Sequence, residues 1–73
     1  MQLPEFYPVQ SSNVEAVAYS PESETAYVRF LNGSTYAYKG VSANAYENLR
    51  KAASVGSHLN SYFKNVYPYE RVS

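Results

Sequence analysis

The chain has 73 residues, enough for one small domain and too few for a second hydrophobic core. Hydrophobic residues make up 45% of the sequence and charged residues 16%, a composition that excludes an intrinsically disordered chain. Six basic residues balance six acidic ones, which argues against a polyanion binder held by bulk charge. The absence of cysteine excludes disulfides and thiolate metal sites, so nine tyrosines and three phenylalanines must supply most of the core.

The beginning of the chain predicts neither a secretory signal nor a membrane span. Residues 1–15 have no basic start and no apolar run, and no window approaches the ~20 apolar residues that cross a bilayer. We therefore expect a cytoplasmic protein without a membrane partner. Residues 1–10 are predicted to be an extended leader, because Pro4 and Pro8 disfavour helix at the residues before them. Residues 11–73 are predicted to form a single domain.

Three strands are predicted after the leader. Residues 13–19 form the first, and residues 25–31 alternate apolar and polar side chains in the manner of a half-buried strand. Asn32 and Gly33 follow, which is the strongest short-range signal for a β-hairpin. Residues 34–39 form the third strand, so the order predicts a three-stranded antiparallel meander.

The last third of the chain is predicted to be helical. Ser42 can cap a helix over residues 43–53, Gly56 breaks the chain, and Ser57 can cap a second helix. The apolar stripe of this second helix is Leu59, Tyr62, Phe63 and Val66. The sequence therefore predicts an α+β domain of order β-β-β-α-α, with both helices packed on one face of the sheet.

The hairpin turn decides whether two central tyrosines lie in the core or on the surface. Tyr36 and Tyr38 are two residues apart on the third strand, so they share one face. A two-residue turn at residues 32–33 would place them opposite Arg29 and Tyr27. They would then join an outward surface of aromatic and basic residues, which suits base stacking.

A three-residue loop gives the opposite result. If residues 31–33 form the loop, Tyr36 lies opposite Val28 and Tyr38 opposite Ala26, inside the core. This second register gathers the apolar side chains on one face of the sheet. A slip of one residue would move all of them to the opposite face. Segregation of apolar residues therefore favours the three-residue loop, with the tyrosine hydroxyls reaching the rim.

Few residues in the sequence suit catalysis. There is no aspartate, the six glutamates show no recognisable pairing, and His58 is the only imidazole. The three glycines form no phosphate-binding loop, and no nucleophile has the spacing of a known elbow. We expect no enzymatic activity, no cofactor and no metal site.

Basic residues are concentrated in the second half of the chain. These candidate nucleic-acid contacts are Lys39, Arg50, Lys51, Lys64 and Arg71. The hypothesis is that they line one edge of the domain, with tyrosines as stacking surfaces. So few phosphate contacts predict weak and strongly salt-dependent binding. The alternative is an ordinary solvated surface, since cations at the end of the first helix also suit the helix dipole.

Short motifs run along residues 11–72. They are Ser11-Ser12-Asn13-Val14, Val17-x-Tyr19, Val28-x-Phe30, Asn32-Gly33, Tyr36-x-Tyr38, Tyr46-x-x-Leu49, Ser54-x-Gly56, Asn60-x-x-x-Lys64 and Tyr67-x-x-x-Arg71-Val72. Together they resemble the KTSC domain, a short module at the end of some lysyl-tRNA synthetases that also occurs as stand-alone bacterial and phage proteins. The chain departs from the family pattern at Ser42, where proline is common, and at His58-Leu59, where Tyr-Phe is common.

The resemblance carries implications for fold and function. It marks as family motif residues, with structural roles expected, Tyr36, Tyr38, Gly56, Asn60 and Tyr67. Attachment to synthetases suggests binding of nucleic acid, RNA ahead of DNA. The alternative is a protein-interaction module, for example a phage protein that docks on a host or virion protein through exposed tyrosines. Salt dependence would separate the two, because a polyanion complex weakens strongly with added salt.

Overall fold

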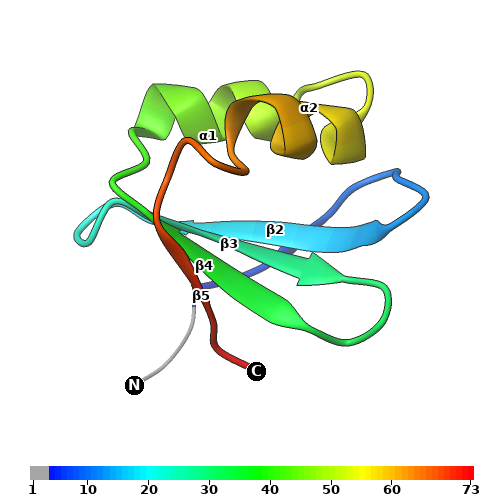
Figure 1. The fold of residues 1–73 in the computed structure, drawn as a ribbon, viewed down its shortest axis with the longest axis horizontal. Helices are drawn as coiled ribbons and strands as arrows, with labels where there is room; N and C mark the ends of the chain where they lie inside the picture. The colour runs from blue at the N-terminus through cyan, green and yellow to red at the C-terminus, as the bar shows by residue number, and fades with distance from the viewer. Residues whose placement is uncertain (1–3) are drawn as a thin grey trace.

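Two helices lie on one face of a five-stranded antiparallel sheet in the computed structural model, which describes residues 4–73 (Figure 1). The elements in chain order are β1 (Tyr7–Pro8), β2 (Val14–Ser20), β3 (Thr25–Phe30), β4 (Thr35–Lys39), α1 (Ala43–Arg50), α2 (Val55–Tyr62) and β5 (Tyr69–Arg71). The strands lie side by side in the order of the sequence, from β1 to β5. None of the helices in these residues is long and apolar enough to span a bilayer.

The sheet has two strands more than the three that the sequence predicts. β1 pairs with β2, where Tyr7 lies opposite Val17, and β5 pairs with β4, where Tyr69 lies opposite Tyr38. Strands of two and three residues are too short to show alternation, so only the neighbouring strand reveals them. Pro8 is tolerated because it lies on an edge strand. The predicted leader is thus partly in the sheet, and its residues 1–3 lie outside the described residues.

The β3–β4 hairpin has the three-residue loop that apolar segregation favours. The Phe30 N–H donates to the Ser34 carbonyl over 2.8 Å, and the Gly33 N–H donates to the Phe30 carbonyl over 2.9 Å. Gly33 has φ +94°, a left-handed conformation that glycine adopts without strain. The register therefore places Tyr36 and Tyr38 on the face that the helices cover, with Tyr38 buried and Tyr36 half-buried.

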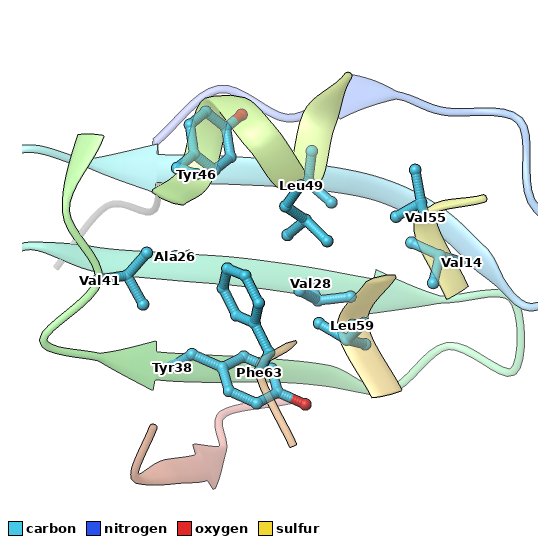
Figure 2. Packing of buried hydrophobic residues seen from close by; sticks show 11 residues of the cluster. Val14, Ala26, Val28, Tyr38, Val41, Tyr46, Leu49, Val55, Leu59 and Phe63 are labelled. Carbon is cyan, nitrogen blue, oxygen red and sulfur yellow. The ribbon is translucent and has the colours of Figure 1, made fainter. Parts of the chain in front are cut away.

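One hydrophobic core fills the space between the sheet and both helices (Figure 2). Its buried members are Val14, Val17, Ala26, Val28, Tyr38, Val41, Tyr46, Leu49, Val55, Leu59 and Phe63. Every strand from β2 to β4 and both helices contribute to this set, so the helices and the sheet stabilise each other through shared apolar burial.

The first helix begins where the sequence predicts. The Ser42 hydroxyl accepts a hydrogen bond from the Ala45 N–H over 3.1 Å and caps α1. The helix ends at Arg50, three residues before the predicted end, with Lys51 as its C-cap. Tyr46 and Leu49 are its buried residues.

The second helix begins earlier than the sequence predicts, and Gly56 lies inside its first turn. Ser54 is the N-cap, and its hydroxyl accepts from the Ser57 N–H over 3.3 Å. A Cβ at Gly56 would lie 2.6 Å from Oδ1 of Asn13. The glycine is therefore explained by close packing of the helix against Asn13, and the prediction of a chain break was wrong.

The buried stripe of α2 also differs from the prediction. Val55, Leu59 and Phe63 face the core at four-residue spacing, whereas Tyr62 and Val66 are exposed. The earlier helix start explains this difference, because Val55 now supplies the first turn of the stripe. Tyr62 is left on the outer side of α2, and Val66 follows the helix end.

Candidate functional site

A cavity of about 600 Å³ lies between α2 and the helix-covered side of β3, β4 and β5. Its lining residues are Ser12, Asn13, Phe30, Asn32, Tyr36, Tyr38, Ser54, Gly56, Ser57, Leu59, Asn60, Lys64 and Tyr69. We call it the tyrosine groove. Four of the five motif residues that the KTSC resemblance marks are in this lining: Tyr36, Tyr38, Gly56 and Asn60.

Aromatic rings in mutual contact form one side of the tyrosine groove. The ring centroid of Tyr69 lies 5.7 Å from that of Tyr36 and 5.4 Å from that of Tyr38. Phe30 packs edge-on against Tyr36 at 5.6 Å. The strand register causes this arrangement, because partners opposite each other on β4 and β5 point to the same face. Tyr69 remains 52% exposed, so its ring is held by its neighbours and still open to solvent.

Helix α2 and the residues after it supply the polar side of the groove. Gly56 and Asn60 lie four residues apart on one side of α2, and Lys64 follows in the turn after the helix ends at Tyr62. Lys64 is the only charged residue in the lining. The ion pairs of residues 4–73 do not include Lys64, and their hydrogen bonds do not include the Asn60 side chain. A cation and an amide are thus available beside the aromatic rings.

The segment before β2 closes one end of the groove. The Ser11 hydroxyl donates to Oδ1 of Asn13 over 3.0 Å and accepts from the Val14 N–H over 3.2 Å. The same Asn13 oxygen is the atom that Gly56 approaches. These contacts hold the Asn13 amide in a defined position at the groove wall.

The pKa of the Tyr38 hydroxyl in the groove is raised above its ordinary value, which favours the neutral form. Burial raises the pKa of Tyr38, and the nearby Tyr69 and Tyr36 hydroxyls raise it further. Figure 2 shows the Tyr38 hydroxyl at the outer edge of the core cluster, beyond its ring. A neutral hydroxyl both donates and accepts hydrogen bonds, so it can pair with either kind of polar ligand atom.

The five predicted cations differ in their ionic partners. Lys39 is the last residue of β4, and its Nζ lies 3.0 Å from Oε1 of Glu70. Arg50 and Lys51 both pair with Glu47 at the end of α1, over 2.9 Å and 3.4 Å. The Arg50 hydrogen bonds lower the pKa of Glu47, so this carboxylate stays charged at neutral pH. Three of the five cations therefore have an anionic partner.

Arg71 lies next to the tyrosine groove. It is opposite Tyr36 in the β4–β5 pair, so both side chains project from the helix-covered face. Its Nε donates to the Ser73 carbonyl over 3.0 Å, and Arg71 is in none of the ion pairs of residues 4–73. Lys64 and Arg71 are thus the two predicted cations at this end of the molecule.

A second cavity, of about 410 Å³, lies at α1. It is lined by Tyr7, Tyr19, Ala43, Tyr46, Glu47 and Arg50. The Tyr19 and Tyr46 rings stack with centroids 4.9 Å apart, and the Tyr19 hydroxyl donates to the Val41 carbonyl over 2.6 Å. The Tyr46 hydroxyl is buried and makes no hydrogen bond within residues 4–73. This cavity is therefore bordered by an ion pair and a packed tyrosine stack.

Two further predicted residues have packing roles. Tyr67 is half-buried with its ring 5.0 Å from that of Phe63, and His58 is half-buried against Tyr62 at 4.7 Å.

Among residues 4–73 there is no group of three His, Cys, Asp or Glu side chains that could hold a metal ion.

Sequence reasoning missed the role of three groove residues. The sequence predicts no strand at Tyr69, and it assigns neither Ser54 nor Ser57 to a binding site. No alternation marks β5 in the sequence, because a strand of three residues is too short to show one. The groove itself could not be predicted, because its lining comes from segments that lie far apart along the chain.

Comparison with known proteins identifies relatives over most of the chain. The sequence model of the KTSC domain matches residues 10–67. An uncharacterised protein of Stutzerimonas stutzeri is 35% identical over 65 residues, which cover 88% of this chain and 92% of that protein. A lysine–tRNA ligase of Nostoc punctiforme is 30% identical over 64 residues, which cover 88% of this chain and 11% of the ligase. The crystal structure of a KTSC domain protein from Yersinia pestis superposes with a TM-score of 0.87 at 27% identity, covering 94% of this chain and 97% of that one.

Proposed function

The chain belongs to the KTSC domain family, and we propose that it is a small non-catalytic RNA-binding domain whose contact face is the tyrosine groove. The observation that carries this proposal is the groove lining, which combines one cation with an aromatic cluster whose Tyr69 ring is exposed, and which contains no acidic residue. Stacking rings and a cation are the two elements that single-stranded nucleic acid contacts use.

Charge favours this face over the other cationic surfaces. Lys39, Arg50 and Lys51 each lie within 3.4 Å of a carboxylate, so an approaching phosphate would have to compete with that carboxylate. Lys64 and Arg71 have no such competitor in the ion pairs of residues 4–73. We therefore assign the main phosphate contacts to Lys64 and Arg71, with the other three cations as peripheral contacts.

One relative supports RNA as the ligand. The Nostoc punctiforme protein is by name a lysine–tRNA ligase, and this chain matches only 11% of its length. An appended RNA-binding module can be useful even when its affinity is low, because tethering gives it a high effective concentration near the bound RNA.

The test is an amide NMR titration with a short mixed-sequence RNA at low and at physiological salt. We expect shifts around Tyr36, Asn60, Lys64 and Tyr69 that fade as salt rises, since each phosphate contact adds about 0.7 to the salt slope for a single strand. Lys64→Ala should weaken binding several-fold, whereas the matched control Lys51→Ala should leave it nearly unchanged. Absence of shifts at low salt would contradict the proposal.

A protein partner is the alternative function, supported by a different surface. Tyr62 and Val66 are 62% and 60% exposed on and just after α2. Large exposed apolar side chains of this kind are typical of protein contacts. Binding of a host protein that changes little with salt and is lost in Tyr62→Ser, together with no RNA shifts, would favour this alternative.

A further inference from the structure

We propose that the tyrosine groove holds one unpaired base of a single strand, with the adjoining phosphate on Lys64, and that the domain therefore prefers single strands to duplexes. This inference rests on the proposed function, because it names the part of the RNA that enters the site. It adds a requirement that phosphate attraction alone would not impose, namely an accessible base face.

The dimensions of the groove fit a base. A volume of about 600 Å³ lies within the range of small-ligand clefts. Residues from α2 stand on one side and residues from β4 and β5 on the other, so a flat group can enter between them. In a duplex both faces of a base are covered by its stacked neighbours, and only its edges and the backbone are accessible. A duplex can thus offer charge to Lys64 but no base face to the rings.

Tyr69 is the stacking platform. Its ring is supported by Tyr36 and Tyr38, with centroids at 5.7 Å and 5.4 Å, and it is still 52% exposed. A ring already held by its neighbours loses little conformational freedom when a ligand covers it. Loss of one base–aromatic contact of this kind weakens binding on the order of tenfold.

Two amide side chains line the groove beside the rings and are the candidate partners of a base edge. Asn60 and the fixed Asn13 both line the groove, and an amide offers donors and an acceptor to a base edge. Lys64 lies in the turn just after α2 and lines the same groove as Asn60, so we assign to it the phosphate next to that base. The stacking ring, the amides and the cation thus line one groove.

The experiment compares three ligands of equal length at low salt. They are a single-stranded RNA octamer, its blunt duplex, and an octamer whose central nucleotides are abasic and keep their phosphates. Fluorescence anisotropy gives the affinity of each, and amide NMR spectra verify that every variant is folded. We expect the intact single strand to bind on the order of tenfold more tightly than the other two ligands.

Two variants of Tyr69 assign the preference to the ring. Tyr69→Leu should remove most of the advantage of the single strand, whereas Tyr69→Phe keeps the ring and should retain it. Equal binding of all three ligands, unchanged in Tyr69→Leu, would overturn the base inference and leave RNA binding intact. Absence of binding to any of the three at low salt would instead overturn the proposed function.

Discussion

The two helices cover the same sheet face, yet their surroundings differ in chemistry. At α1, Arg50 and Lys51 share Glu47, and the adjacent tyrosines are stacked against each other. Just after α2, Lys64 is in none of the ion pairs of residues 4–73, and it shares the groove lining with the exposed ring of Tyr69. The comparison teaches that the number of cations on a helix says little about ligand binding. What matters is whether each cation already has an anionic partner.

The largest expected effect tests the packing on which the α2 end depends. Phe63 is 1% exposed and lies against Tyr38 and Tyr67. Phe63→Ala should lower the free energy of unfolding by about 3–5 kcal/mol, because it removes a large buried ring and leaves a cavity. Urea denaturation followed by circular dichroism measures this. A loss below about 1 kcal/mol would mean that α2 does not depend on this ring.

The tyrosine stack at α1 offers two substitutions with opposite expected effects. Tyr19→Phe removes the hydrogen bond to the Val41 carbonyl and should cost about 1 kcal/mol of unfolding free energy. Tyr46→Phe removes a buried hydroxyl that has no hydrogen-bond partner within residues 4–73, so stability should stay the same or rise slightly. Thermal denaturation of both variants beside the native chain tests the difference, and equal losses would contradict it.

High pH should loosen the fold through tyrosine ionisation. Burial raises the pKa of Tyr38 and of Tyr46 above the ordinary value of 10.0. The folded state therefore favours the neutral form, so this contribution is complete below pH 10 and is lost as the pH rises through the folded pKa. Denaturation between pH 8 and pH 11 should show falling stability, with a smaller fall in Tyr38→Phe. A flat profile would be the contrary result.

The smallest expected effect tests whether pairing with Glu47 keeps Arg50 and Lys51 from binding RNA. Glu47→Gln removes the carboxylate that Arg50 and Lys51 share. We expect a modest gain in RNA affinity at low salt and a steeper salt dependence, by about 0.7 for each new phosphate contact. Lys64 should remain the dominant cation. No change in the salt slope would show that pairing with Glu47 is not what keeps these cations from RNA.

Local sequence signals predicted the central part of the fold well. The turn at Asn32 and Gly33, the alternation along β3 and the Ser42 cap are short-range features, and each has the predicted geometry. The short edge strands β1 and β5 carry no periodic pattern of their own. They form because β2 and β4 offer unpaired backbone groups at the two edges of the central sheet, and the sequence does not show which segments pair there.

The candidate site was harder to predict, for the same physical reason. Gly56 looked like a helix breaker, because the sequence does not show that Asn13 lies against it. The sequence predicts the five cations as one group because all of them lie in the second half of the chain, but their partners Glu47 and Glu70 decide which remain available. Contacts between distant segments therefore set the chemistry of the site.

The position of β5 in the chain has a consequence for the order of folding. Every other strand pair is joined by a short connection, whereas residues 40–68, with both helices, separate β4 from β5. Closing a longer loop costs more chain entropy before its contacts form. We expect β5 to join the sheet last and to open first in hydrogen exchange. Since Tyr69 belongs to β5, the groove is assembled only in the last step, and partly folded chains would lack it.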